Sequence, residues 1–303
     1  MTRNMNQFAL LAAFLLAGCT IDGNALNVGG RGGNTDVLGL LHAGGQFLNA
    51  ASLGEKDEDV IGQSVAATIT SQHPPVANTN LQRYVNLVGL TVANASPRPD
   101  GNWVFGVIDS PDVNAFSGPN GYVLVTRGAL MRMQDEAELA GVLAHECAHV
   151  CNHDGLTQVK AAEQKGALVN AMKSADSRTA QMAVFADSGI DVITKQGYSQ
   201  PEEFKADEDA VRIMANAGYD PNSYLNFLRR LQSGGGPSGG QIMSTHPGIG
   251  QRIARVQAAI GGVPRTGPTN GATLVQRFTF NLQQAGVQGG NLQIVPAPPP
   301  IYR

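Results

Sequence analysis

The chain has 303 residues, of which 42% are hydrophobic and 15% are charged. This composition is typical of a globular protein with one sizeable core, and it excludes a wholly disordered chain. The formal net charge of −3 and the lack of any dense lysine and arginine cluster in the sequence argue against nucleic-acid binding.

The N-terminal segment has the pattern of a secretory signal. Arg3 precedes an apolar run from Phe8 to Leu16, which is too short to span a membrane. The run leads into the letters LAGC, which resemble the bacterial lipobox and end at Cys19. We therefore expect residues 1–18 to be a cleaved signal peptide and Cys19 to carry a lipid. An ordinary cleaved signal with an incidental cysteine is the alternative.

The residues after the lipobox predict where the protein is anchored. Cys19 is followed by Thr20 rather than by Asp. In this respect the chain resembles lipoproteins that are sorted to the outer membrane. The predicted location is therefore the cell envelope, on the outer membrane and facing the periplasm. Residues 19–34 are rich in Gly and Asn, which is typical of a flexible tether.

Helical patterning begins near Asp36, and residues 35–260 are predicted to form the main domain. The segments Glu55 to Ser71 and Asn78 to Ala95 have the spacing of scaffold helices. Trp103 to Ile108 and Tyr122 to Thr126 are predicted to be strands joined by a loop. The second of these strands could serve as an edge onto which an extended peptide adds. A plain structural hairpin is the alternative.

The segment Val142 to His153, VLAHECAHVCNH, carries the strongest chemical signal. His145 and His149 are four residues apart, so on a helix both rings can converge on one cation while Glu146 reaches the space beside it. Such a carboxylate can take the proton of a metal-activated water during amide hydrolysis. The spacing predicts one zinc ion per chain, with His145 and His149 as ligands and Glu146 as the catalytic base.

The same helix is predicted to have an acidic first turn at Asp135-Glu136 and an apolar stripe opposite the histidines. Cys147 and Cys151 lie on this stripe, so we expect small buried core residues rather than ligands. The segments Gly155 to Lys173 and Thr179 to Lys195 are predicted to be two further helices without assignable chemistry.

The next helix offers a third ligand. Ser199 and Glu202 have the spacing of a capping box, so Glu202 is accounted for by the cap. Glu203 and Asp207 instead fall on the stripe that should face the core, and a buried charge needs a partner or a metal. Glu203 as a zinc ligand and Asp207 as the group that orients a ligating histidine meet that demand. A solvated acidic face is the alternative.

Two more histidines are candidates for the site. His153 lies four residues after His149, and we expect it to support the ligands or to end the helix. His246 follows the Gly-rich run Ser233 to Gly240. Its ring could occupy the open position of the zinc, which we favour, or stabilise the oxyanion during turnover. A surface or helix-capping histidine is the alternative.

The C-terminal part of the chain is predicted to contain helices at Pro221 to Gln232 and at Gly250 to Ile260. Residues 261–303 form an extension with one candidate strand, Ala272 to Phe280, and an extended PAPPP tail.

Four motifs in order resemble the gluzincin metallopeptidases of the HtpX and CAAX prenyl endopeptidase family, in its soluble periplasmic lipoprotein branch. They are NAFSGPNGYVLVTRGAL, HECAHVCNH, EEFKAD, and STHP with Arg252, and they cover Asp109 to Ile260. The resemblance departs at Asn120, which interrupts a usual Pro-Gly-Gly, and at the two cysteines of the metal helix. It implies these roles: zinc binding by His145, His149 and Glu203; a base at Glu146; support from Asp207; a substrate groove lined by Asn114, Ala115, Phe116 and Tyr122; and His246 near the metal.

We therefore expect an α+β, mostly helical, zincin-like endopeptidase with a small β-sheet beside the active-site helix. The resemblance implies unfolded or misassembled envelope proteins as substrates, hence a role in periplasmic protein quality control. The alternative is a non-catalytic chaperone or assembly lipoprotein that uses the same fold. Glu146 favours the enzyme, because a protein that only binds has no need of a base beside a metal.

Overall fold

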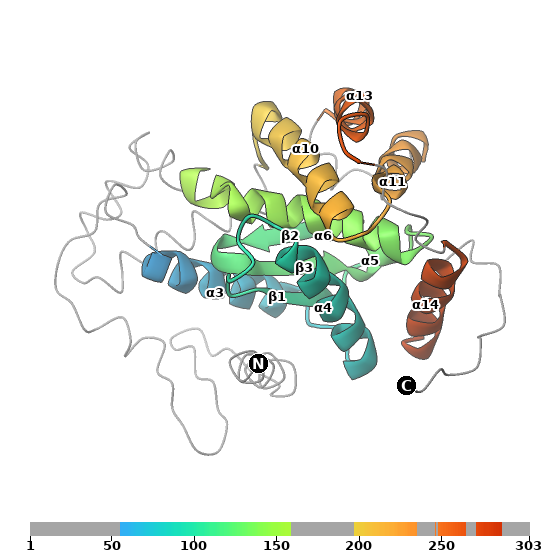
Figure 1. Ribbon diagram of the computed structural model, residues 1–303. Coiled ribbons are helices and arrows are strands. Elements are labelled where there is room, and N and C mark those ends of the chain that lie inside the picture. Colours follow the sequence, from blue (N-terminus) through green and yellow to red (C-terminus); the bar gives the residue numbers. More distant parts are fainter. Residues whose placement is uncertain (1–54, 159–196, 235–245, 247, 265–270, 287–303) are drawn as a thin grey trace, which may run out of the picture.

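The computed structural model describes residues 55–158, 197–234, 246, 248–264 and 271–286 (Figure 1). The expected signal peptide, Cys19, the tether and the helical start near Asp36 lie outside these residues, as do most of 155–195, residues 235–240 of the Gly-rich run and the PAPPP tail. Within the described ranges, no helix combines the length and the apolar composition that a membrane span requires.

The described elements confirm an α+β fold that is mostly helical. In chain order they are α3 (Glu55–Gln72), α4 (Thr79–Asn94), β1 (Val104–Ile108), β2 (Ala115–Gly118), a 3-10 turn (Pro119–Gly121), β3 (Tyr122–Thr126), α5 (Arg127–Leu130), α6 (Glu136–Cys151), α10 (Gln200–Asn216), α11 (Pro221–Ser233), α13 (Ile249–Ile260) and α14 (Gly271–Gln284).

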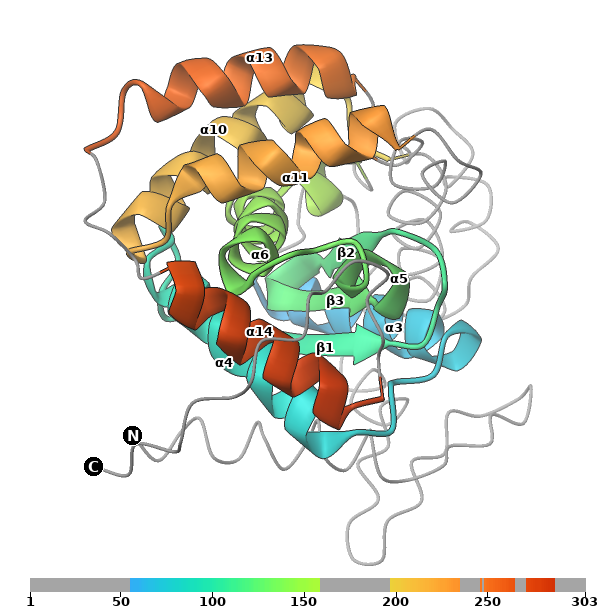
Figure 2. The ribbon, with the colours of Figure 1, turned by 90° about the vertical axis from the view of Figure 1, so that its right-hand side faces the viewer.

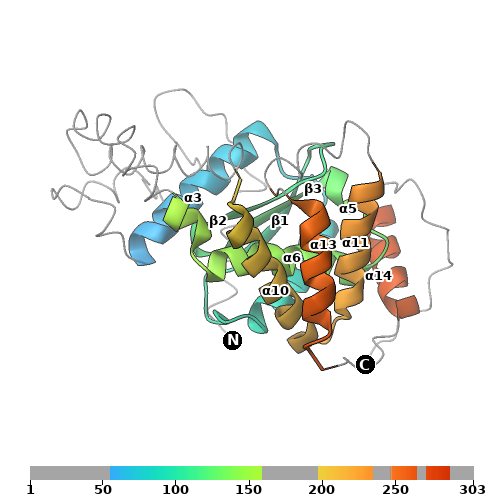
Figure 3. The same cartoon turned by 90° about the horizontal axis from the view of Figure 1, so that it is seen from above.

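The elements form layers around α6. Figure 2 shows α6 end-on, between the layer of α10, α11 and α13 and the small sheet. Seen from above, α10, α13 and α11 lie side by side across α6 (Figure 3). Helix α4 packs against β1, and α3 packs against β2. Helix α6, which the sequence predicted to carry the metal ligands, lies between the two layers at the buried centre of the domain. Every residue of α6 from Glu136 to Val150 is buried.

Local signals in the sequence explain the helix boundaries. Asn78 caps α4 by accepting a hydrogen bond from the Leu81 amide, and Asp220 caps α11 in the same way through Asn222. The backbone amide of Ser199 donates to the Glu202 carboxylate at 2.7 Å, which confirms the predicted capping box at the start of α10. The helices predicted from periodicity at 55–71, 78–95, 221–232 and 250–260 are all present.

The sheet differs from the prediction. Its strand order is β1-β3-β2, with β1 parallel and β2 antiparallel to β3. The two predicted strands therefore do not form a hairpin with each other, and the strand at 122–126 is central rather than an edge. The edge beside α6 is β2, which lies inside the segment predicted to be a loop. Sequence patterning missed it because four residues, AFSG, are too few to show a period.

The turn between β2 and β3 accommodates Asn120, the residue that interrupts the usual Pro-Gly-Gly of the family. This residue has φ of 61° and Gly121 has φ of 102°, both in the left-handed region. Asn tolerates that region better than most residues, and its side-chain amide here donates to Asp59 at 2.8 Å. The replacement of Gly by Asn is therefore compatible with the same turn.

The candidate strand at 272–280 is wrong, because these residues lie in the helix α14. Leu274, Phe278 and Leu282 are buried at intervals of four residues, which is the helical period. Leu282 lies beyond residues 272–280, the segment that was predicted to be a strand. Figure 2 shows α14 beside α4, and it also packs against α6, so this part of the extension belongs to the domain core.

Candidate metal centre and active site

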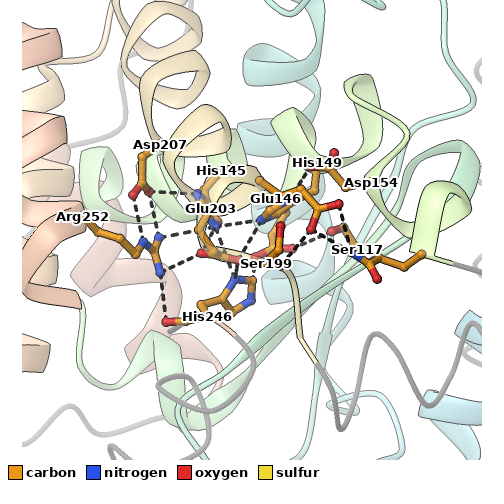
Figure 4. A network of polar contacts seen from close by, with 12 residues as sticks. Ser117, His145, Glu146, His149, Asp154, Ser199, Glu203, Asp207, His246 and Arg252 are labelled. Atoms are coloured by element: carbon orange, nitrogen blue, oxygen red, sulfur yellow. Dashed lines mark hydrogen bonds and ion pairs between the residues drawn. The ribbon is translucent and has the colours of Figure 1, made fainter. Parts of the chain in front are cut away.

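His145 and His149 project from successive turns of α6, and a carboxylate holds each ring. Nδ1 of His149 lies 2.7 Å from Asp154, and Nδ1 of His145 lies 3.1 Å from Asp207 (Figure 4). A carboxylate at Nδ1 keeps the proton on that nitrogen, so Nε2 is left to act as a ligand. The two Nε2 atoms face each other at 3.1 Å.

Glu203 comes to this pair from α10, and His246 comes from the segment before α13. The Glu203 carboxylate lies 3.5 Å from Nε2 of His145 and 3.4 Å from Nε2 of His149. Nδ1 of His246 lies 2.9 Å from Glu203 and 3.4 Å from Nε2 of His145. The four side chains offer donor atoms that all lie within 4.8 Å of one another, and all four are buried.

This donor set fits a zinc ion. Two ligands bound tetrahedrally at about 2.0–2.1 Å from zinc would be roughly 3.3 Å apart. The separations among His145, His149 and Glu203 are 3.1–3.5 Å. Two imidazole lone pairs that face each other at 3.1 Å repel unless a proton or a metal ion lies between them. The residues present are therefore suited to the metal that the sequence pattern predicts.

Glu146 lies beside the cluster without belonging to it. Its Oε2 accepts a hydrogen bond of 2.7 Å from the hydroxyl of Ser117 on β2, and its Oε1 lies 3.7 Å from Nε2 of His246 (Figure 4). The side chain is buried. A carboxylate in this position can exchange a proton with a molecule held at the cluster.

Arg252 of α13 joins the carboxylates into one network. Its guanidinium donates to both oxygens of Asp207 at 2.8 Å and lies 3.0 Å from Glu203. The Tyr224 hydroxyl also donates to Asp207, at 2.8 Å. Tyr224 can come this close because Gly141 of α6 has no side chain: a Cβ there would lie 2.6 Å from the Cβ of Tyr224. Arg252 also donates to the carbonyl of His246, at 3.4 Å.

The electrostatics of the cluster favour a cation. Burial raises the pKa of Asp207, but the positive charge and hydrogen bonds of Arg252 outweigh it and hold this pKa below its usual range. Burial lowers the pKa of His149, but hydrogen bonds with Asp154 and Glu203 raise it to about 10. The same negative surroundings that attract a proton to His149 also attract a divalent metal ion.

Of the two cysteines predicted to be buried core residues, Cys147 is buried, whereas Cys151, at the end of α6, is partly exposed. Cys147 is buried on the core side, and burial raises the pKa of its thiol, which fits an inert core residue. His153 does not join the cluster. It follows the end of α6 with φ of 56°, and its half-exposed ring is hydrogen-bonded to Glu58 of α3 at 3.0 Å. Of the two predicted roles for His153, its position fits the one at the end of the helix.

The predicted groove residues lie along β2 and β3. Asn114 is buried just before β2, and its carbonyl accepts from Thr126. Ala115 and Phe116 are the first residues of β2. Tyr122 begins β3, and its hydroxyl donates to Asp59 at 3.3 Å.

Sequence reasoning missed four residues that contact the site: Asp154, Ser117, Tyr198 and Tyr224. Asp154 lies one residue after the predicted His153, and the left-handed turn at that histidine directs Asp154 back to His149. Tyr198 stacks on His149 with ring centroids 4.0 Å apart. Its position directly before the capping box of α10 was the only available signal in the sequence.

Together the fold and the site define a zinc metallopeptidase of the His-Glu-x-x-His class. The comparison with known families agrees: the model of peptidase family M48 matches residues 79–260, so the chain belongs to this family.

Named relatives share the same region. The chain is 27% identical over 216 residues to the beta-barrel assembly-enhancing protease of Escherichia coli K12, across 67% of this chain and 43% of that protein. It is 26% identical to a protease HtpX homolog of Acaryochloris marina, across 83% and 89%. The mitochondrial metalloendopeptidase OMA1 of Schizosaccharomyces pombe is 27% identical, across 66% and 57%. The chain thus spans less than half the length of the Escherichia coli relative.

Proposed function

We propose that the protein is a zinc-dependent endopeptidase that cleaves unfolded or misassembled proteins of the bacterial cell envelope. The observation that carries this proposal is the position of Glu146. Its carboxylate lies 3.7 Å from His246, at the edge of the four-donor cluster, and is held by Ser117 rather than by any of the three ligands from α6 and α10. A protein that used the metal only for its fold would not need a separate base at this point.

The residues divide the work of amide hydrolysis. Bound zinc supplies a Lewis acid that polarises the scissile carbonyl and lowers the pKa of water. His145, His149 and Glu203 hold it, and Asp154 and Asp207 fix the orientation of the two rings. Glu146 accepts the proton of the attacking water through the oxygen nearer the cluster and then delivers it to the leaving amine.

The unpaired edge of strand β2 is the observation that favours unfolded proteins as the substrate class. No described segment pairs with its outer side, whereas residues 75 and 76 partly cover the outer side of β1. An extended peptide can add to β2 by main-chain hydrogen bonds, which require a segment without structure of its own. Asn114, Ala115 and Phe116 would then line the groove together with Tyr122. A segment that is already paired within a folded core cannot add to β2 in this way.

Comparison of cleavage termini tests this function. Cells that express wild-type protein should contain peptide termini that are absent from cells expressing Glu146→Gln. The variant should keep its zinc and lose roughly 10²–10⁴ in rate, because only the proton transfer is removed. A fully active Glu146→Gln protein would contradict the peptidase mechanism.

We propose that His246 gates the cluster. Its Nδ1 lies 2.9 Å from Glu203, and the ring completes the four-donor set. A substrate carbonyl would therefore have to displace this ring before it could reach a metal ion held by the other three donors. His246→Ala should then raise activity on an unfolded substrate. A fall of roughly 10²–10³ would instead assign the ring to oxyanion stabilisation, and unchanged kcat, KM and zinc affinity would contradict both roles.

We propose a lipid anchor at Cys19, on the basis of the LAGC sequence, and a place on the outer membrane, on the basis of Thr20. The name of the Escherichia coli relative refers to beta-barrel assembly, which fits an envelope role.

The rival function is a chaperone or assembly module without catalysis. It predicts that Glu146→Gln complements a deletion strain as well as the wild type does. The peptidase predicts that complementation is lost.

A further inference from the structure

Ser117 is a polar residue on a sheet face that is otherwise apolar. Side chains alternate along a strand, so Ser117 shares its face of β2 with Ala115, and the register partners of these two residues on β3 are Val123 and Val125. Those three neighbours belong to the main hydrophobic core. Ser117 itself is only 3% exposed. A buried hydroxyl costs free energy unless it is hydrogen-bonded, so its partner indicates what it does.

The partner of Ser117 is the catalytic base. The Ser117 hydroxyl donates to Oε2 of Glu146 at 2.7 Å, across the boundary between β2 and α6 (Figure 4). Glu146 is 1% exposed, so few water molecules can take over this bond. A hydrogen bond to an ionised acceptor is about twice as strong as one between neutral groups. The bond therefore fixes the rotation of the carboxylate.

The direction of this bond follows from the two groups. A serine hydroxyl has one hydrogen, and a carboxylate oxygen accepts it. The Ser117 hydrogen is therefore directed at Glu146. The ring of Tyr198 stacks on His149 beside this pair, with ring centroids 4.0 Å apart.

We propose that Ser117 is a positioning residue for the general base: its hydroxyl holds Oε2 of Glu146 so that Oε1 faces the metal cluster and takes the proton. The 3.7 Å separation between Oε1 and Nε2 of His246 places that oxygen at the cluster. This inference rests on the proposed peptidase function. It adds that the strand that aligns the substrate also aligns the base, because Ser117 is part of β2.

The test compares two serine variants of the full-length, zinc-loaded protein. Ser117→Ala removes the hydroxyl, and Ser110→Ala is the matched control. Ser110 is also buried, at 2% exposed, but its hydroxyl bonds to Asp112 in the loop after β1. Ser117→Thr keeps a hydroxyl and suits a strand. The measurements are kcat and KM on an unfolded protein substrate, zinc content, and the Kd of acetohydroxamate by calorimetry.

Ser117→Ala should lower kcat by roughly 10- to 100-fold, the equivalent of one hydrogen bond to a charged group. KM should change by less than about twofold, because the bond acts on the base and not on substrate binding. Zinc content should stay at that of the wild type. Acetohydroxamate should bind roughly tenfold more weakly, because its proton passes to the base on binding. Ser117→Thr should recover most of both losses, and Ser110→Ala should show neither.

An unchanged kcat in Ser117→Ala would overturn the proposal. So would a loss of kcat that is matched by an equal loss of zinc, or a well-folded Ser117→Thr protein that recovers nothing, since either result assigns the hydroxyl a structural role. Failure of the proposed function has a different signature: the zinc-loaded wild type would then cleave no substrate.

Discussion

Replacing Arg252 with Met should destabilise the metal-free protein strongly. Arg252 is 3% exposed, and its guanidinium contacts the two carboxylates of Glu203 and Asp207, both of which are completely buried. Met has a similar length but carries no charge, so both carboxylates lose the cation that compensates them. Breaking a buried ionic network in this way costs about 3–5 kcal/mol in the free energy of unfolding.

The metal changes the size of this effect. For a domain of this size, 1 kcal/mol moves Tm by roughly 2–4 °C, so the metal-free Arg252→Met protein should melt about 6–20 °C below the wild type. Zinc brings positive charge to Glu203, so the difference in Tm should be smaller after zinc is added. The structure thus predicts both a loss and its partial recovery.

Urea denaturation in the presence of a chelator measures the loss, and Arg255→Met is the control. Arg255 lies on the same helix, but its side chain is 52% exposed and its ion pair with Glu208 is at the surface. Its replacement should change the free energy of unfolding by no more than about 1 kcal/mol. If the two metal-free variants unfolded within about 1 kcal/mol of each other, the buried network would not have the energetic role described here.

Three further predictions concern the metal and the anchor. Glu203→Ala should weaken zinc binding in a chelator competition assay, whereas Glu202→Ala, which removes the helix cap and the hydrogen bonds from Gln158, should not; undiminished affinity would remove Glu203 from the site. Zinc binding to the metal-free protein at pH 7 should release protons, because the pKa of His149 is raised to about 10 and the ring must be neutral to bind the metal; calorimetry in buffers of different ionisation enthalpy counts them, and a value near zero would refute the assignment. Cys19→Ala should leave the protein soluble or unprocessed, and membrane attachment after normal processing would show that another group anchors it.

The local features of this fold could be predicted from the sequence. A helix follows from the spacing of its apolar residues and its cap, as with Ser199 and Glu202 of α10, and the ligands of α6 follow from a spacing of four residues. Glu203 could be predicted as a ligand because its charge conflicts with the buried helix face on which it lies. Each of these inferences needs only residues within one or two helical turns.

The features that were missed depend on distant contacts. Strand pairing joins segments that are not adjacent in the sequence, so the insertion of β3 between β1 and β2 left no local signal. The role of Asp154 depends on the backbone angle of one residue, His153. The role of Ser117 depends on the register that brings β2 over α6. Side-chain type alone predicts none of these.

The contacts of α14 join the start of the active-site helix to a segment beyond the family match. Glu136, the first residue of α6, is buried, and Arg277 of α14 binds its carboxylate together with the hydroxyls of Tyr84 and Tyr219. Arg277 follows Glu136 by 141 residues and lies beyond residue 260, where the family match ends.

A chain cut after residue 260 would keep every metal ligand but leave this carboxylate without its cation and the apolar surface under α14 uncovered. The newly made chain is in the same condition until α14 has been synthesised. The active-site helix therefore reaches the environment that the structure shows only after α14, which ends at Gln284, has been made.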